Sequence, residues 1–393
     1  MQKKLILVDG NNLMFRSYYA TAYSGRMMKN SKGLPTNALF GFASMINKII
    51  AEENPTYMAV AFDIGLNFRK SKYDFYKEGR TKTPDELNEQ MPIARDMLDC
   101  LGIKHFELAP YEADDIIGTI AKMTEIDPDF ASVIVSSDKD LLQLISHETE
   151  VKLLKQTGFI RYNYDTFKED YKIEPIRIID LKALMGDSSD NIPGVPGIGE
   201  KTALKLLQEY GSLDDLYANL DKITGKVKEK LEMGKESAYM SKDIATIYRD
   251  VPLDITLEDL KLDLSDDTKI KAMYQELEFF SLLKSDIKPK NADELSYKVI
   301  DELDDLKLAN DIAIYLELDN ANYHIANIIG MSITDKDNNY FIKKELVKDA
   351  LEFIKNKNIT TYDLKKVIGN TKIPVNGTFD VSIAAYILGL NSK

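Results

Sequence analysis

Acidic residues recur at the ends of short apolar runs in the first half of the sequence. Asp9 ends "KLILVD", Asp63 ends "YMAVAFD" and Asp138 ends "ASVIVSSD". Further acids lie close together in "YEADD", "SDKD" and "GDSSDN". Carboxylate oxygens suit hard divalent cations, and two such ions about 4 Å apart can stabilise both the attacking and the leaving oxygen of a phosphodiester. The candidate metal ligands are Asp9, Asp63, Glu112, Asp114, Asp115, Asp138, Asp140, Asp187 and Asp190.

Each of these acids, taken alone, has an ordinary structural explanation. An aspartate after a strand is common turn chemistry, and an acid in the first turn of a helix interacts favourably with the helix dipole. Three strand-terminal acids together with three acidic pairs or triplets favour one shared site over many separate explanations.

The pattern around these acids indicates an α/β architecture. Short apolar runs at 4–9, 57–63, 103–109 and 131–138 are typical of parallel strands buried on both faces. Helical patterns lie between them at 37–54, 85–102 and 112–125. Such sheets place their sites beyond the carboxyl ends of the strands, so the three strand-terminal acids should meet at one edge. From about 176 to 284 the pattern is helical, with expected helices at 176–187, 201–211 and 237–250.

A basic strip follows the second acid. From Arg69 to Lys82 there are six cations interleaved with the aromatic residues Tyr73, Phe75 and Tyr76. Such a mixture suits a nucleic-acid single strand, because bases stack on the rings and phosphates pair with the cations. A solvated helix face is the alternative explanation.

The stretch "GVPGIGEKT", from Gly194 to Thr202, has the glycines and the Lys-Thr pair of a nucleotide-binding loop. That loop needs a contiguous Gly-Lys-Thr after a strand, and here Glu200 intervenes. A hairpin between two helices, with the second helix starting at Glu200, fits better. Its glycines allow tight turns, and the amides at the helix start could hold one phosphate of a DNA backbone.

These motifs, together with "LILVDGNNLMFRSYYA" and "GLPTNALFGF", resemble the 5′-nuclease domain of bacterial DNA polymerase I, within the flap endonuclease family, over residues 1 to about 287. The resemblance implies a PIN-like catalytic core at 1–175 with a mainly parallel sheet, then a helix-hairpin-helix DNA-binding region at 176–287. It also implies that all nine acids are the carboxylates of the family. Asp114, Asp138 and Asp140 would surround one metal ion, and Asp187 and Asp190 would lie nearer a second.

The resemblance assigns roles to cations as well. Lys77 and Arg80 would act at the scissile phosphate, beside the catalytic Asp138 and Asp140, and the basic strip would form part of an arch. The hairpin would grip duplex DNA, with K⁺ held by its carbonyl groups. The DNA-binding residues implied in this way are Arg16, Arg69, Lys70, Lys72, Tyr76, Lys77, Arg80, Gly194, Gly197, Gly199, Lys201 and Thr202.

After a polar linker at 288–295, residues 296–393 resemble the start of the proofreading exonuclease-like domain of DNA polymerase I. We therefore expect a partial, ribonuclease H-like α/β domain there. Two acidic positions of that domain are filled by Tyr315 and Val367, which predicts that it is inactive. Glu317 and Asp319 could imitate an acidic pair, but a scaffold is the preferred interpretation.

Composition limits the remaining possibilities. The 393 residues carry a net charge of −13, which by itself argues against nucleic acid unless the charges are segregated. The single cysteine, Cys100, cannot form an internal disulfide, and with only three histidines a protein-only zinc site is not expected. No apolar run approaches the roughly 20 residues that span a bilayer. A cytoplasmic protein with no membrane association is expected.

The sequence thus predicts a 5′-3′ exonuclease or flap endonuclease that uses two Mg²⁺ or Mn²⁺ ions. Its expected substrates are 5′ flaps, nicked duplexes and RNA-primed duplex DNA in replication and repair, with a C-terminal polymerase domain as a possible continuation. The alternatives are a non-catalytic module that binds DNA structures and an RNA-processing nuclease of the same fold.

Overall fold

The computed structural model describes residues 2–22, 27–65, 67–264, 267–284, 297–320 and 322–387. The chain divides into two compact units, Met1–Pro289 and Lys290–Lys393. The linker predicted at 288–295 lies outside the described residues. Within the described ranges, no helix is both long and apolar enough to cross a membrane.

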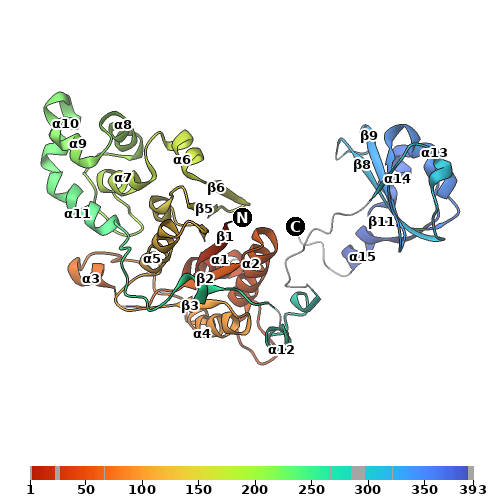
Figure 1. The fold of residues 1–393 in the computed structure, drawn as a ribbon, viewed down its shortest axis with the longest axis horizontal. Helices are drawn as coiled ribbons and strands as arrows, with labels where there is room; N and C mark the ends of the chain where they lie inside the picture. The colour runs from red at the N-terminus through yellow and green to blue at the C-terminus, as the bar shows by residue number, and fades with distance from the viewer. Residues whose placement is uncertain are drawn as a thin grey trace. The chain divides into compact units, whose positions relative to one another are not determined.

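The first unit contains a six-stranded sheet with the order β3-β2-β1-β4-β5-β6, which is parallel except for β6 (Figure 1). The α/β architecture with a mainly parallel sheet is therefore confirmed. Strands β5 and β6 extend one edge beyond the four strands that the sequence predicts. The strands are β1 (Lys3–Asp9), β2 (Tyr57–Ala61), β3 (Lys104–Phe106), β4 (Phe130–Ser136), β5 (Thr149–Leu154) and β6 (Phe159–Tyr162).

The central strand β1 contributes to two separate cores. Leu5 and Leu7 pack in one hydrophobic cluster with α5, whereas Ile6 and Val8 pack in another with α1, α2 and α4. Because both faces are buried, apolar residues run without interruption until Asp9. The helices are α1 (Gly10–Ala22), α2 (Asn37–Glu53), α4 (Asp85–Cys100) and α5 (Ala113–Ile126).

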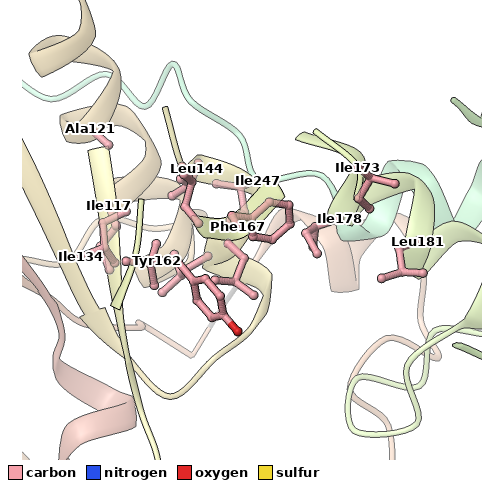
Figure 2. Close-up of a cluster of buried hydrophobic side chains, with 14 of the residues drawn as sticks. Ile117, Ala121, Ile134, Leu144, Tyr162, Phe167, Ile173, Ile178, Leu181 and Ile247 are labelled. Atoms are coloured by element: carbon pink, nitrogen blue, oxygen red, sulfur yellow. The ribbon is translucent and has the colours of Figure 1, made fainter. Parts of the chain in front are cut away.

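The helical part of the unit shares the first of these cores. Figure 2 shows Ile117 of α5 in the same cluster as Phe167 of α6 and Leu181 of α7. This packing fixes α7 beside the carboxyl edge of the sheet. Helix α11 ends at Ala245, earlier than the sequence predicts, because the following segment runs along α5, where Val251 N donates to Thr119 Oγ1 at 3.0 Å. The remaining helices are α3 (Phe68–Lys72), α6 (Tyr164–Tyr171), α7 (Ile178–Met185), α8 (Glu200–Tyr210), α9 (Leu213–Ala218), α10 (Gly225–Met233), α11 (Lys235–Ala245) and α12 (Thr268–Glu276).

A buried ion-pair network ties α2 to the sheet. Glu53, at the end of α2, accepts hydrogen bonds from Lys4 at 2.7 Å, Lys152 at 3.0 Å and Arg161 at 3.1 Å. Burial alone would raise the pKa of Glu53, but these hydrogen bonds and charges outweigh it and lower the pKa to about 2. The carboxylate is thus held ionised where β1, β5 and β6 meet the helix.

The second unit has a mixed six-stranded sheet with the order β12-β11-β8-β9-β10-β7. Val367 is buried on α14, and Tyr315 is exposed on β8, so neither supplies an acidic side chain. Asp319 accepts two hydrogen bonds from Asn327, at 2.8 Å each, and thereby closes a turn. The elements are β7 (Lys298–Ile300), β8 (Asp311–Leu318), β9 (Ile328–Thr334), β10 (Asn339–Lys343), α13 (Val347–Ile354), β11 (Asn358–Thr361), α14 (Leu364–Thr371), β12 (Gly377–Asp380) and α15 (Val381–Ile387).

Candidate active site

A polar pocket of about 190 Å³ opens where the carboxyl ends of three strands meet. Asp9 is the last residue of β1, and Asp63 and Asp138 follow two residues after β2 and β4. Asp114 reaches the same pocket from the first turn of α5. The sequence-based expectation that these acids meet at one sheet edge therefore agrees with the geometry. The lining residues are Asp9, Asn11, Asn12, Phe15, Asp63, Lys77, Arg80, Glu112, Ala113, Asp114 and Asp138.

Four of these acids form no ion pair within 4 Å among the described residues: Asp9, Asp63, Asp114 and Asp138. Neutral donors hold three of them in place. Asp9 accepts from the backbone N of Asn12 and from Ser136 Oγ, both at 2.9 Å. Asp63 accepts from Ala113 N at 2.7 Å, and Asp138 accepts from Asp140 N at 2.8 Å. We call these four residues the open acids.

Burial and mutual repulsion perturb the open acids. Burial, followed by the nearby charges of Asp63 and Asp138, raises the pKa of Asp9 to about 7. Burial and the charges of Asp138 and Asp9 raise the pKa of Asp114 well above its ordinary value. A cluster of oxygen donors with no cation of its own fits a hard divalent ion. Among the described residues, no three acids form a ready-made metal shell, so water would have to complete the coordination.

The other predicted acids already contact cations of the protein. Asp115 is fully buried and accepts from Arg69 at 2.8 and 2.7 Å, and Glu112 accepts from Arg69 at 2.9 Å and also contacts Lys77. Asp115 does not line the pocket. Its side chain joins α5 to Arg69 in the interior, and its role as a metal ligand stays a prediction.

Arg69 also differs from the expectation of an exposed basic strip. It is buried, and its remaining donors bind the carbonyl groups of Ile244 at 3.0 Å and Thr246 at 2.7 Å. The basic residue thus neutralises buried acids in this structure, and its role as a DNA contact stays a prediction. Sequence spacing could not reveal this, because the partners come from α5 and from the end of α11.

The rest of the strip divides between the surface and the pocket. Lys70 is exposed without an ion pair in the described chain, whereas Lys72 pairs with Asp243 at 2.8 Å. Tyr76 is buried, and its hydroxyl donates to Glu112 at 3.1 Å, so it cannot stack on a base. The role of Tyr76 as a DNA contact stays a prediction. Lys77 lines the pocket, and its backbone N donates to the Asp190 carbonyl at 2.9 Å.

Two further basic residues complete the account. Arg80 contacts Asp190 from the rim of the pocket, and its Nε donates to the Ser189 carbonyl at 3.3 Å. Arg16 lies on α1, donates to the carbonyl of Lys155, and is not among the pocket-lining residues.

Lys182 is a site residue that sequence reasoning missed. It is buried on α7, and its Nζ contacts both Asp140 and Asp187. Burial, followed by the charge of Asp138, raises the pKa of Asp140 to about 7, although Lys182 acts against this. Burial alone would raise the pKa of Asp187 too, but hydrogen bonds from Lys182 and Ser189 lower it. The available signal was a single lysine within an apolar helix, "IIDLKALM".

The hairpin before α8 has the predicted start at Glu200. Gly194 has a φ of 63°, and a Cβ there would clash with the backbone of Gly186. Gly197 has a φ of 79°, and its carbonyl accepts from Lys230 Nζ at 2.8 Å. Gly199 has an ordinary negative φ and open space around it, so no tight turn requires glycine there.

A groove of about 550 Å³ lies beside this hairpin. It is lined by Lys201 and Thr202, and also by Lys205 and Lys222. Within the described chain these three lysines form no ion pair, and all three are exposed. No strand of the described chain precedes the hairpin directly, so the arrangement of a nucleotide-binding loop is not present.

Comparison with known families decides the identity. Residues 4–172 match the N-terminal resolvase-like domain of 5′-3′ exonucleases, and residues 173–268 match the C-terminal SAM fold of the same proteins. The chain belongs to the 5′-3′ exonuclease family. Residues 314–393 match the ribonuclease H-like domain of DNA polymerase I. The family resemblance expected from the sequence is therefore confirmed.

Curated relatives of this 5′-3′ exonuclease are DNA polymerases I. That of Bacillus caldotenax is 39% identical over 406 residues, which cover 99% of this chain and 46% of the relative. That of Streptococcus pneumoniae strain R6 is 40% identical over 401 residues, covering 98% of this chain and 46% of the relative. The chain thus spans about half the length of the curated relatives it matches.

Solved structures share the fold of the 5′-3′ exonuclease part. A flap endonuclease of bacteriophage T5, in a complex with DNA and metal ions, superposes with a TM-score of 0.51 at 24% identity. That match covers 63% of this chain and 90% of the phage protein. The catalytic core of Rad2 in complex with a DNA substrate has a TM-score of 0.50 at 16% identity, covering 72% and 93%. At these identities the likeness concerns the fold alone.

Proposed function

We propose that the chain is a structure-specific, divalent-metal-dependent 5′ nuclease that hydrolyses phosphodiester bonds of 5′ flaps, nicked duplexes and RNA-primed duplex DNA in replication and repair. The observation that carries this proposal is the pocket itself. The four open acids share it with Lys77 and Arg80, so anionic metal ligands and phosphate-binding cations line one small cavity. The product ends would be a 5′-phosphate and a 3′-hydroxyl.

The metal ions we propose are Mg²⁺ or Mn²⁺, two per site. When bound, they would make water a better nucleophile at neutral pH and offset the charge of the reacting phosphate. The open acids, Asp9, Asp63, Asp114 and Asp138, would hold one ion, with water completing its coordination. The resemblance groups Asp140 with the first ion, but Asp140 and Asp187 both contact Lys182, so we propose Asp140, Asp187 and Asp190 as ligands of the second ion. Their oxygen chemistry fits such ions, and a bound cation would offset the burial and the neighbouring carboxylates that raise the pKa of Asp9 and Asp114.

The residues of the chain itself would bind and orient the phosphodiester. Lys77 Nζ lies against Glu112, and the Arg80 guanidinium lies against Asp190. Both cations face the pocket, so a phosphate entering it would compete with these carboxylates for their N–H donors. Positioned donors aimed at developing negative charge are among the largest contributions to such catalysis. Asn11 donates to Asp63 at 3.2 Å and helps to keep the acids in place.

The proposed duplex grip uses the hairpin and its groove. Lys201, Lys205 and Lys222 offer three unpaired cations beside the start of α8, which suits backbone phosphates rather than bases. Exposed Lys70 could meet the single-stranded flap. K⁺ at the hairpin carbonyls would have to share the Gly197 carbonyl with Lys230. In the curated relatives the matched half is part of a DNA polymerase I, so a polymerase domain is the proposed partner, and the cytoplasm is the proposed location.

A direct test is incubation with an end-labelled 5′-flap duplex in Mg²⁺, in Mn²⁺ and in EDTA. We expect cleavage near the flap junction in either metal and none in EDTA. Binding without cleavage in both metals would instead support a non-catalytic DNA-binding module. Faster cutting of a folded RNA than of the flap would support the RNA-processing alternative.

A further inference from the structure

The acids of the site fall into two electrostatically different halves. The open acids have no ion-pair partner among the described residues. On the other side, Asp140 and Asp187 share one buried ammonium, that of Lys182. The protein thus leaves the four open acids without an ion pair and places one cation of its own, Lys182, between Asp140 and Asp187.

The backbone and the core hold Lys182 in this position. Its neighbours on α7, Leu181 and Ala183, are buried in the hydrophobic core, so the helix cannot rotate without losing this packing. Asp187 is fixed from its other side, where its Oδ1 accepts from Ser189 N at 2.8 Å and Ser189 Oγ at 2.6 Å. The carboxylate oxygens that remain therefore converge on the ammonium.

We propose that Lys182 occupies the place between Asp140 and Asp187 that a second divalent ion would need. It is a positioning residue that makes the two ions bind unequally, an inference that rests on the divalent-metal dependence of the proposed function. One ion binds at the open acids, which no ammonium or guanidinium of the described residues contacts within 4 Å. The second must displace the ammonium before it can reach its carboxylates.

Simple electrostatics supports the competition. An ammonium and a divalent cation cannot both lie against the same two carboxylates, since two unit charges 4 Å apart already interact by several kcal/mol at an effective dielectric constant near 20. The four-carbon stem of a lysine is flexible and can withdraw. A DNA phosphate in the pocket is an anion to which the ammonium could move. The second ion would then join mainly when substrate is present.

The test is a titration of the full chain with Mn²⁺ in the absence of DNA, with free Mn²⁺ followed by electron paramagnetic resonance. For the wild-type protein we expect one ion to bind tightly and a second to bind at least about tenfold more weakly. In Lys182→Met the second ion should bind at least about tenfold more tightly than in wild type, and the first should change by less than about threefold. Two equally tight ions in wild type, or an unchanged second ion in Lys182→Met, would overturn the inference.

A matched control is available on α11. Lys242 also bridges two aspartates, Asp180 and Asp214, each at 3.0 Å, but neither of these is a proposed metal ligand. Lys242→Met should leave both ion affinities unchanged, and a tightened second ion there would contradict a local role for Lys182. Circular dichroism checks that Lys182→Met is folded. If it is not, the inference is tested by the two Mn²⁺ affinities of the wild-type protein and by those of Lys182→Arg. The arginine keeps the charge and should keep the second ion weak.

The outcomes separate this inference from the proposed function. A protein that cuts the flap in Mg²⁺ but binds two equal ions contradicts only the competition by Lys182. A protein that binds no Mn²⁺ and cuts no flap contradicts both the proposed function and the inference.

Discussion

Replacing Arg69 with methionine should destabilise the nuclease unit without removing a DNA contact. The side chain makes five hydrogen bonds: two to Asp115, one to Glu112, and one each to the carbonyl groups of Ile244 and Thr246. Methionine keeps the apolar stem but leaves two buried carboxylates without this partner. Removing one member of a buried ion pair costs about 3–5 kcal/mol. At roughly 2–4 °C of Tm per kcal/mol, the expected fall in Tm is about 10 °C.

The assay is differential scanning calorimetry of the full chain at pH 7 with an excess of EDTA. Lys72→Met is the matched control, because it removes a neighbouring cation whose pair with Asp243 is exposed on both sides. An exposed pair contributes about 0–1 kcal/mol, so the control should stay within about 3 °C of wild type. The contrast between the two variants isolates the contribution of burial.

The opposite pattern would refute the reasoning. If Arg69→Met melts with wild-type Tm, and its affinity for a flap duplex falls with a salt dependence flatter by about one unit, then Arg69 contacts phosphate. The buried position described above would then be wrong, and the interpretation of the strip as a DNA-binding surface would hold for this residue.

Four further predictions concern chemistry, binding and stability. Asp138→Ala should abolish flap cleavage in single-turnover assays while binding in Ca²⁺ stays within a few-fold of wild type; a rate above about a tenth of wild type would contradict the assignment. Lys201→Ala should weaken duplex binding and flatten its salt dependence by about one unit, and ATP binding lost in this variant would speak against that role. The pKa of Glu53 is about 2 in the folded chain and about 4.3 when unfolded, so its stabilisation of about 3 kcal/mol is complete above pH 4.3 and disappears as the pH falls through 2. Glu53→Gln should therefore have a lower Tm than wild type at pH 7, and this difference in Tm should become smaller near pH 2. Equal Tm values at pH 7 would contradict the stabilising role of the Glu53 ion pairs. The full chain should not shorten a 3′-labelled mismatched primer in Mg²⁺ or Mn²⁺, because Val367 is buried where an acid is needed; steady shortening lost on Glu317→Ala would refute this.

The sequence was informative where a local pattern and its function coincide. Continuous apolar runs ending in Asp9 and Asp63 predicted both the parallel strands and the edge where the acids meet, because strand ends of a parallel sheet share one side. The hairpin before Glu200 was predictable for a similar reason, since the interrupted Gly-Lys-Thr motif and the helix start are adjacent in the sequence. In both cases the deciding residues lie within one short segment.

What the sequence could not give was the partner of each charge. Arg69 and Lys182 are ordinary cations in the sequence, and only the tertiary packing of α5 and α7 turns them into buried partners of acids. Strands β5 and β6 were missed in the sequence. A strand is revealed by an alternation of apolar and polar residues or by an apolar run, and both patterns are short and irregular between Thr149 and Tyr162. The sequence could not tell which role Tyr76 has. Aromatic residues interleaved with cations can pack in a hydrophobic interior as readily as they can stack on a nucleic-acid base.

The gathering of the open acids has a consequence for the order in which the chain folds. Asp9, Asp63, Asp114 and Asp138 come from four separate segments, which meet only when the parallel crossovers are complete. Contacts between residues so distant in the sequence form late, because closing long loops costs entropy before any contact is gained. The last step then brings like charges together, against their repulsion. Divalent ions present during refolding should therefore speed the approach to the native state more than they alter the early, local helices.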